Sequence, residues 1–155
     1  MQQEIGPRMI EVRPVVPLDE QTWRSMWADY NTFYEATVPD HVTRSTWDRI
    51  LDPGFPFGAV LAVDGDTPMG FANYVVGPYT WSDRPHCLME DLFVIPETRS
   101  RGVGRAIIQH LIDLCRREGW TELFWITRES NAAARRLYDS FTPADGFIQY
   151  TIELD

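Results

Sequence analysis

Hydrophobic and polar positions repeat with two different periods along the chain, and these periods separate expected strands from expected helices. The strand-like segments are residues 9–13, 59–63, 69–76, 87–95, 123–127 and 147–154. The helix-like segments are residues 19–34, 43–51, 102–117 and 130–139, with apolar side chains gathered on one face. The expected order is therefore strand, two helices, three strands, helix, strand, helix and strand.

Three local signals refine this order. Asp19 can cap the first helix, and the turn from Asp64 to Thr67 has the chemistry of a hairpin between antiparallel strands. Residues 123–127 are apolar on both faces, which is typical of a central strand. We therefore expect an α/β (α+β) fold, in which a mixed, mostly antiparallel, twisted sheet carries helices on both faces.

Length and composition fit one domain over residues 1–155. The 155 residues are 44% hydrophobic, which is enough for one packed core, and the chain is short for two domains. The net charge of −9 disfavours nucleic acid and anionic lipid as partners and favours a cationic partner. All 14 basic residues are arginines, a bias that genomic base composition explains better than function does.

Cysteine, histidine and leader patterns exclude several classes of protein. Cys87 and Cys115 lie in apolar runs, and His41, His86 and His110 have no partner at a metal-binding or relay spacing. We therefore expect neither a metal site nor a disulfide framework. The N-terminus has no signal-peptide pattern, and no apolar run approaches the roughly 18 residues of a membrane span. These features predict a cytoplasmic protein that does not enter membranes.

Residues 94–105 join a strand end, a short loop and the start of a helix. Gly102 and Gly104 let backbone N–H groups approach a ligand closely, and the helix dipole favours an anion at this end. Arg99, Arg101 and Arg105 add three positive charges. A pyrophosphate would fit this segment, Arg99–Arg105, which we call the cradle. The alternative is that the glycines only cap the helix and that the arginines lie in solvent.

Two common nucleotide loops are excluded by residues that are missing. A P-loop requires a lysine that reaches the outer phosphates, and this chain contains no lysine. A dinucleotide-binding fingerprint requires a third glycine at the position where Ile107 stands. The cradle is therefore neither a P-loop nor a dinucleotide-binding loop.

The sequence around the cradle resembles a known superfamily. Arg99-x-x-Gly102-x-Gly104 follows the segment Asp91–Pro96, and the segment Asn131–Tyr138 comes later in the chain. Together these motifs resemble the acyl-coenzyme A motifs of the GNAT-type N-acetyltransferase superfamily, over residues from about 87 to 150. Met89–Val94 more narrowly resembles the polyamine and diamine N-acetyltransferase branch, whose corresponding strand carries the same acidic pair.

This resemblance implies acetyl-coenzyme A (acetyl-CoA) as the cofactor. The backbone of Leu92, Phe93 and Val94 would pair with the pantetheine arm like an added strand. The pyrophosphate would be held by the cradle residues Arg99, Ser100, Arg101, Gly102, Val103, Gly104 and Arg105. On the last helix, Asn131, Arg135 and Tyr138 fall at i, i+4 and i+7 and share one face. There Asn131 can hold the cofactor, Arg135 can meet a phosphate, and Tyr138 can reach the sulfur.

Acetyl transfer to an amine requires a proton acceptor, because an alkyl amine with a pKa near 10.4 is neutral in only about one molecule per thousand at pH 7. Glu90 interrupts an apolar strand and is the candidate base, and strand alternation would place it on one face with Leu92 and Val94. Tyr138 is the candidate acid that protonates the departing thiolate. The alternatives are a Glu90 carboxylate paired with an arginine such as Arg84, and a Tyr138 ring that belongs to the core.

Glu35, Trp81 and Asp91 are candidate contacts for the acceptor, because aromatic rings and carboxylates suit an alkylammonium group. Tyr30, Phe33 and Tyr34 of the first helix, with Tyr79 and Asp83 before the acidic strand, could line the same acceptor pocket. The alternative is that the aromatic face of this helix is mostly core, which is the expectation for Trp23, Trp27 and Tyr30. The expected function is acetyl transfer from acetyl-CoA to a primary amine, foremost a small cationic amine such as a polyamine or diamine, by direct attack in a ternary complex. The alternatives are a catalytically silent acyl-CoA-binding regulatory module and a protein or peptide N-acetyltransferase. The chain could also form a homodimer.

Overall fold

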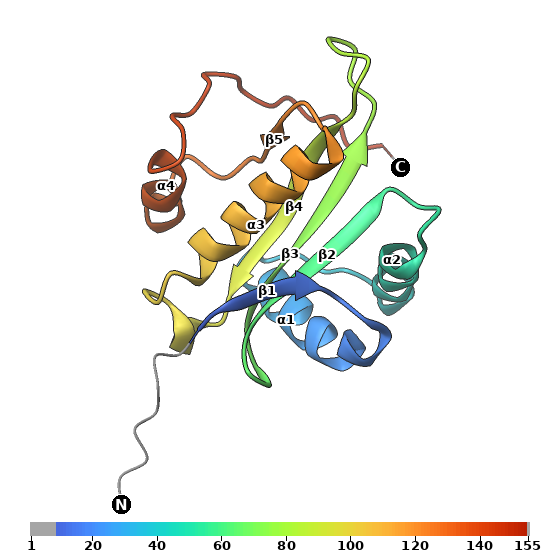
Figure 1. Ribbon diagram of the computed structural model, residues 1–155, viewed down its shortest axis with the longest axis vertical. Coiled ribbons are helices and arrows are strands. Elements are labelled where there is room, and N and C mark those ends of the chain that lie inside the picture. Colours follow the sequence, from blue (N-terminus) through green and yellow to red (C-terminus); the bar gives the residue numbers. More distant parts are fainter. Residues whose placement is uncertain (1–8, 155) are drawn as a thin grey trace, which may run out of the picture. The chain divides into compact units, whose positions relative to one another are not determined.

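The computed structural model describes residues 9–154, and these residues form two compact units that divide after Trp125. The larger unit contains a five-stranded sheet with the strand order β1-β2-β3-β4-β5. Its strands are β1 (Glu11–Pro14), β2 (Phe57–Asp64), β3 (Thr67–Gly77), β4 (His86–Val94) and β5 (Leu123–Phe124) (Figure 1). Its α-helices are α1 (Glu20–Phe33), α2 (Asp40–Leu51) and α3 (Val103–Glu118), and its 3₁₀ turns are η1 (Pro17–Asp19) and η2 (Pro96–Thr98). The smaller unit contains α4 (Ala132–Asp139).

Neighbouring strands from β1 to β4 run antiparallel, and β5 runs parallel to β4. The turn between β2 and β3 falls at Gly65 and Asp66, where the φ of +60° at Gly65 is a conformation that glycine adopts without strain. The predicted hairpin and the predicted mixed, mostly antiparallel sheet are therefore confirmed.

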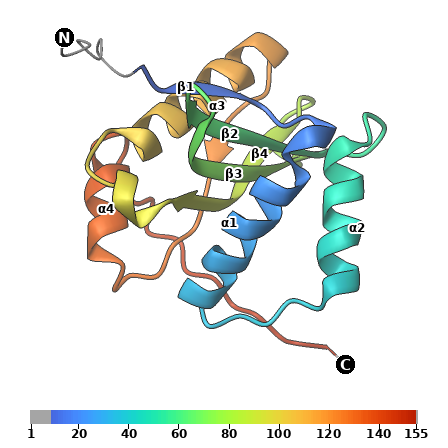
Figure 2. The ribbon, with the colours of Figure 1, turned by 90° about the horizontal axis from the view of Figure 1, so that it is seen from below.

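Helices cover both faces of the sheet, as the sequence predicts. Figure 2 shows α1 and α2 below the sheet and α3 above it. Trp23 and Met26 of α1 pack with Trp47 and Ile50 of α2 against a row of strand residues: Ala59, Leu61, Val63, Phe71 and Phe93. On the opposite face, a Cβ atom at Gly70 would lie 3.3 Å from a methyl carbon of Val103 and 3.4 Å from one of Ile107. The sheet is thus sandwiched between two layers of helices.

Trp23, Trp27 and Tyr30 pack in or against the core, as expected, whereas Phe33 at the end of α1 is 56% exposed. Trp23 is fully buried, and its ring stacks on Trp27 at 5.6 Å between centroids. Tyr30 continues the stack at 5.7 Å from Trp27 and packs against the core cluster. Burial of these large rings supplies much of the apolar area that fixes α1 on the sheet.

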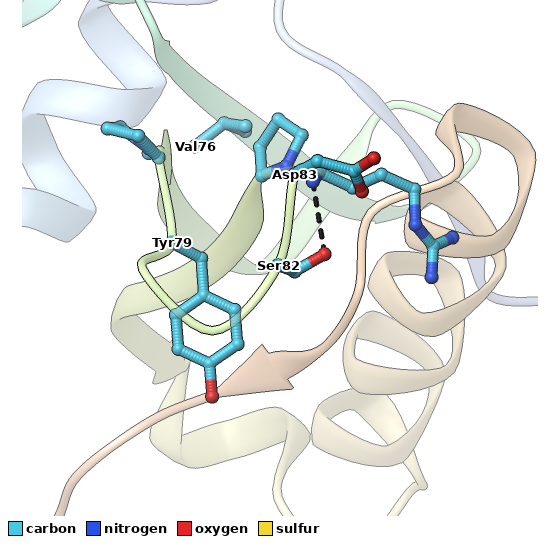
Figure 3. A pocket seen from close by; sticks show the side chains of 8 residues that line it. Val76, Tyr79, Ser82 and Asp83 are labelled. Atoms are coloured by element: carbon cyan, nitrogen blue, oxygen red, sulfur yellow. Dashed lines mark hydrogen bonds between the residues drawn. The ribbon is translucent and has the colours of Figure 1, made fainter.

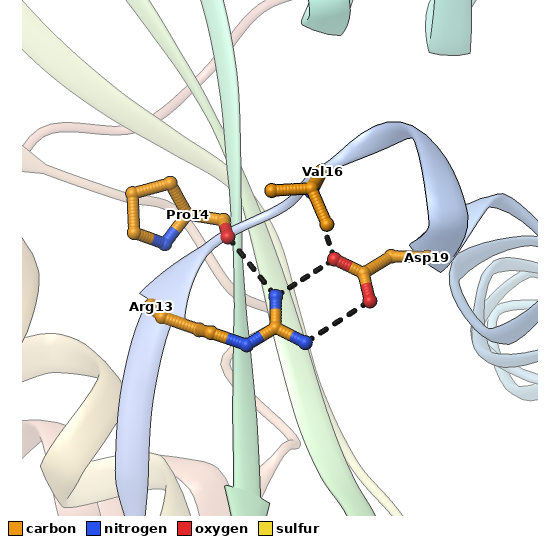
Figure 4. A network of polar contacts seen from close by, with 4 residues as sticks. All are labelled: Arg13, Pro14, Val16 and Asp19. Atoms are coloured by element: carbon orange, nitrogen blue, oxygen red, sulfur yellow. Dashed lines mark hydrogen bonds and ion pairs between the residues drawn. The ribbon is translucent and has the colours of Figure 1, made fainter. Parts of the chain in front are cut away.

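Asp19 has a different role from the one predicted. It occupies the N-cap position of α1, but its side chain makes no cap hydrogen bond to that helix. Instead, the two terminal nitrogens of Arg13 donate to its carboxylate oxygens at 2.7 and 3.0 Å, and the Val16 N–H donates at 2.8 Å (Figure 4). These hydrogen bonds lower the pKa of Asp19. Asp19 therefore fastens β1 to the turn before α1, because a bidentate guanidinium competes successfully for its oxygens.

Several predicted boundaries are wrong. Residues 123–127 do not form a central strand: β5 contains only two residues, and among the described residues of the larger unit it lies at the edge of the sheet. The strand predicted over 147–154 is absent from the smaller unit, because that unit offers no neighbouring strand for its backbone. The helix predicted from Thr43 begins at Asp40, directly after Pro39. The helix predicted from Ser130 begins at Ala132.

Within residues 9–154, no helix combines the length and the apolar character that crossing a bilayer would require.

Candidate active site

The centre of β4 carries a β-bulge at Glu90. Asn73 of β3 pairs with Asp91, and the next residue, Tyr74, pairs with Met89, so that Glu90 has no partner on β3. A bulge inserts one extra residue into a strand and re-aims the side chains around it. Glu90 is exposed, whereas Met89 is buried. The candidate base therefore lies where the strand turns a carboxylate away from the core.

The bulge also explains why Cys87 and Val94, near the two ends of β4, face the same helix. Cys87 faces α3, because its thiol is hydrogen-bonded to Cys115 of that helix. Val94 also faces α3, because its partner Gly70 lies over residues of α3. Two residues seven positions apart would point to opposite faces of a regular strand. The extra residue restores Val94 to the α3 face, and the simple alternation predicted for Glu90, Leu92 and Val94 is interrupted at Glu90.

Asp91 ends a buried chain of hydrogen bonds that starts in α1. The Trp23 indole N–H donates to the Asn73 side-chain oxygen at 3.0 Å, and the Asn73 amide N–H donates to the Asp91 carboxylate at 2.9 Å. Tyr30 also donates to Asp91. Burial raises the pKa of Asp91, and the hydrogen bonds from Asn73 and Tyr30 oppose that rise. α1 thus holds this carboxylate in a fixed orientation beside the bulge.

The two adjacent carboxyl groups affect each other. Partial desolvation raises the pKa of Glu90, and the negative charge of Asp91 raises it further. A carboxylate with a raised pKa is a stronger base than an ordinary glutamate, which suits a group that must take a proton from an ammonium ion. The bulge therefore combines an accessible position with increased basicity.

β4 separates from β5 just before the bulge. The two strands pair only at Cys87 with Leu123 and at Leu88 with Phe124. Within the larger unit, the edge of β4 that faces away from β3 has no strand partner from Met89 onward among the described residues. The peptide groups along this open edge can bind an extended ligand that itself contains amides, as an added strand would. The backbone of Leu92, Phe93 and Val94 lies on this stretch, while the Phe93 side chain is buried in the core.

The cradle follows β4 through η2 and leads into α3. Ser100 has a φ of +67° and Gly102 a φ of +81°, so that the chain reverses sharply within three residues. Gly102 is the N-cap of α3 and has no side chain with which to cap it. The first bond of the helix runs from the Ala106 N–H to the Gly102 carbonyl at 3.0 Å. The N–H groups of Val103 and Gly104 precede it and have no carbonyl within the helix to bind.

This donor set fits a diphosphate. N–H groups at the first turn of a 16-residue helix point outward along a positive dipole end. Arg99, Arg101 and Arg105 surround that turn with exposed side chains. One Arg101 nitrogen lies 3.6 Å from a carboxylate oxygen of Asp64, the last residue of β2. This ion pair orients the Arg101 guanidinium. The cradle could thus hold the diphosphate of coenzyme A, and the open edge of β4 could hold its pantetheine arm.

Three predicted residues belong to the smaller unit. Asn131 is the N-cap of α4, and its amide N–H donates to the Thr127 hydroxyl at 3.2 Å. Arg135 donates through its backbone N–H to the Asn131 carbonyl at 2.9 Å and through its guanidinium to the Glu129 carbonyl at 3.0 Å. Tyr138 lies three residues further along α4, and this spacing keeps the three residues on one face as predicted.

The predicted acceptor contacts lie in two different places. Glu35 follows the end of α1, with a φ of +55°, five residues after Tyr30, the hydrogen-bond partner of Asp91. Trp81 lies instead in the loop between β3 and β4, where 79% of it is exposed. That loop precedes the first residue of β4, so Trp81 is separated from the bulge by the first half of the strand. Glu35 thus follows the helix whose Tyr30 contacts Asp91, whereas Trp81 lies in the loop before β4.

The loop between β3 and β4 contains a pocket, and next to it lies a contact between His86 and Glu122 that the sequence does not reveal. A pocket of about 340 Å³ lies in this loop, and Val76, Tyr79, Ser82 and Asp83 are among its lining residues (Figure 3). The ring of Tyr79, one of the lining residues, stacks on His86 with 4.4 Å between centroids. His86 Nδ1 lies 3.1 Å from a Glu122 carboxylate oxygen, although the two residues are 36 positions apart. Only the parallel pairing of β4 with β5 brings them together, and no sequence spacing signals that pairing.

Comparison with known proteins places the chain in a family. The profile of the acetyltransferase (GNAT) family matches residues 23–141. The D-amino-acid N-acetyltransferase HPA3 of Saccharomyces cerevisiae is 31% identical over 131 residues, which cover 83% of this chain and 81% of that relative. The thialysine N-epsilon-acetyltransferase of Caenorhabditis elegans is 28% identical over 98 residues, 60% of this chain and 61% of that relative.

A solved structure shares the fold. AAC(6')-Iy in complex with the bisubstrate analog CoA-S-monomethyl-acetylneamine superposes with a TM-score of 0.80 at 17% identity, over 95% of this chain and 99% of that chain. The match of the family profile and the similarity to the yeast enzyme show that the chain belongs to the acetyltransferase (GNAT) family. It is an N-acetyltransferase, and its cofactor is acetyl-CoA.

Proposed function

We propose that this enzyme transfers an acetyl group to a small cationic amine, foremost a polyamine or diamine. The proposal rests on one observation: the exposed carboxylate of Glu90 projects from a bulge beside the open edge of β4, next to the fixed carboxylate of Asp91. Two carboxylates attract a cationic acceptor and can take its proton. The net charge of −9 favours the approach of such an acceptor.

Each residue of the site has a proposed part in the reaction. Acetyl-CoA supplies the activated acetyl thioester. Glu90 takes a proton from the ammonium group, directly or through a water molecule, and leaves a neutral amine able to attack. Asp91 and Glu35 bind the positively charged part of the acceptor from the α1 side, and Trp81 serves as a more remote contact. The cradle residues hold the diphosphate, and the backbone of Leu92–Val94 orients the pantetheine arm.

Tyr138 is the proposed proton donor to the departing thiolate, and Asn131 and Arg135 the proposed cofactor contacts of α4. The pKa values of a phenol and a thiol lie near 10 and 8.5, so proton transfer between them is feasible. Asn131, Arg135 and Tyr138 share one face of α4, as a common ligand would require. A cytoplasmic location and a homodimer stay predictions from the sequence.

The named relatives support a small primary amine as the acceptor. One relative is named for D-amino acids and the other for the ε-amino group of thialysine. Both names describe small molecules with a primary amine, and both acceptors also carry a carboxylate that a diamine lacks. Amino acids are therefore the acceptors against which a diamine must be compared.

The experiment is a thiol-release assay with acetyl-CoA and a panel of amines: diamines, polyamines, thialysine, D-amino acids and a short peptide. The proposal predicts the highest kcat/KM with a diamine or polyamine, and a loss of at least about tenfold in kcat for Tyr138→Phe. Greater activity with the peptide would make the enzyme a peptide acetyltransferase. Coenzyme A binding without turnover of any amine would indicate a silent regulatory module. Unchanged turnover in Tyr138→Phe would remove that residue from its role.

A further inference from the structure

Thr98, the last residue of η2, is one of only two buried polar residues in the described part of the chain. It is 8% exposed and directly precedes the cradle. Its hydroxyl oxygen lies 3.0 Å from the Met69 carbonyl oxygen of β3 and 2.8 Å from the Ile95 carbonyl oxygen. A hydroxyl has one hydrogen to donate, so this hydrogen is shared between the two carbonyls. The contact joins the start of the cradle to the interior of the sheet.

The cradle is fixed at its two ends and exposed between them. Val103, its first helical residue, is 2% exposed and packs beneath Gly70 of β3. Thr98 makes the corresponding buried contact on the other side. Between these two residues, Arg99, Ser100, Arg101 and Gly102 are all exposed, and two of them have positive φ values. The position of this short reversal is therefore determined by its two anchors.

Both carbonyls that face the Thr98 hydroxyl also accept a hydrogen bond from a backbone N–H group. The Met69 carbonyl also accepts the Ile95 N–H at 2.8 Å, and the Ile95 carbonyl also accepts the Thr98 N–H at 2.9 Å. Removing the hydroxyl would therefore leave both carbonyls with a backbone donor, and the large penalty of an unsatisfied buried group would not arise. What would be lost is the side-chain link between η2 and β3.

We propose that Thr98 is a positioning residue for the cofactor: its hydroxyl fixes the backbone N–H groups of the cradle at the spacing that the diphosphate of coenzyme A requires. Neither the motif nor its resemblance includes this residue. The inference rests on the proposed placement of the diphosphate in the cradle. Preorganised donors bind an anion more tightly because no ordering is needed when the anion arrives.

The test compares Thr98→Val with Thr98→Ser by calorimetric titration of each enzyme variant with coenzyme A, in the absence of acetyl-CoA. Valine keeps the shape of threonine without its hydroxyl, and serine keeps the hydroxyl without the methyl group. We expect Thr98→Val to raise the Kd of coenzyme A about three- to tenfold, the effect of one hydrogen bond, and Thr98→Ser to stay within about twofold of wild type. The KM for the amine should stay within about twofold in both variants, which a general loss of structure would not allow.

Gly104→Leu, which places a larger side chain in the buried first turn of α3, separates failure of this inference from failure of the cofactor placement. If Thr98→Val binds like wild type while Gly104→Leu binds weakly, Thr98 does not position the cradle but the diphosphate site stands. If both bind like wild type, the placement and the inference are both wrong. Equal weakening in the valine and serine variants would assign the effect to packing of the methyl group and overturn the inference. If Thr98→Val does not fold, the Kd of coenzyme A is measured for Thr98→Ala instead, with the same expected increase and the same contradicting result.

Discussion

The cradle and the bulge lie only a few residues apart on β4 and its continuation, yet they are built in different ways. The cradle consists of backbone donors, glycines and exposed arginines that are close together in the sequence. The bulge depends on partners from α1 and β3, so that Trp23, Asn73 and Asp91 meet across 50 and 18 positions. A phosphate requires a local arrangement of N–H groups. A carboxylate with a raised pKa requires burial and neighbours that only tertiary structure supplies.

This difference assigns separate tasks to the two regions. The cradle should determine how tightly coenzyme A binds and should have little effect on the acceptor. The bulge should determine how fast the acceptor loses its proton and should have little effect on coenzyme A. Substitutions in each region can therefore confirm or break the separation.

The largest effect is expected for Glu90→Gln. Glutamine preserves the size of the side chain but cannot accept the proton of an ammonium group, and loss of a general base lowers kcat by about a hundredfold or more. Steady-state kinetics at saturating amine would measure kcat, and calorimetry would measure the Kd of coenzyme A, which should not change. A kcat near the wild-type value would show that another group takes the proton. A large change in the Kd would show that the two regions are not separate.

A smaller but clear effect is expected for Gly104→Leu. Gly104 is buried in the first turn of α3, so a larger side chain there should displace the N–H groups that would meet a phosphate. Loss of charge-assisted hydrogen bonds should then raise the Kd of coenzyme A about tenfold or more. The KM of the amine should change little. The control is Gly119→Ala at the other end of the same helix, where a φ of +73° makes alanine unfavourable. That variant should lose stability in thermal unfolding and retain its affinity for coenzyme A.

The smallest effect is expected in the pH dependence of kcat/KM for Asp91→Asn. Desolvation and the charge of Asp91 raise the pKa of Glu90, so the wild-type enzyme should lose activity on acidification at a higher pH than an ordinary glutamate would dictate. Removing the Asp91 charge lowers the pKa of Glu90, and the acidic limb of the profile should move to lower pH. A limb that stays in place would mean that Glu90 does not control it.

The contrast between the two regions also explains what could be predicted from the sequence. The cradle, the β2–β3 hairpin and the layered sheet depend on local chemistry and hydrophobic period, and each was predicted from consecutive residues. The bulge could not be predicted, because the period of a strand does not reveal one extra residue. The role of Asp19 could not be predicted either, because the sequence does not show which of several possible partners its carboxylate binds. It accepts hydrogen bonds from Arg13 instead of capping α1. The contact of His86 with Glu122 could not be predicted for a similar reason, because Glu122 lies 36 positions away and directly precedes β5.

Edge positions and chain ends were predicted least well. Residues 123–127 are apolar enough for a central strand, but only Leu123 and Phe124 pair, and they pair with one neighbour. Alternation in residues 147–154 predicted a strand, but alternation does not identify the strand that must receive its hydrogen bonds. A hydrophobic pattern describes one segment only, whereas a sheet forms between two strands, and the pattern does not say which strand is the partner.

The central claim is that the cradle and the open edge of β4 hold coenzyme A, and its most direct test is a crystal structure of the enzyme grown with that molecule. We predict that the diphosphate lies against the N–H groups of Val103 and Gly104, with the pantetheine arm beside Leu92–Val94. The account is contradicted if the diphosphate lies elsewhere on the protein, or if the arm runs away from β4.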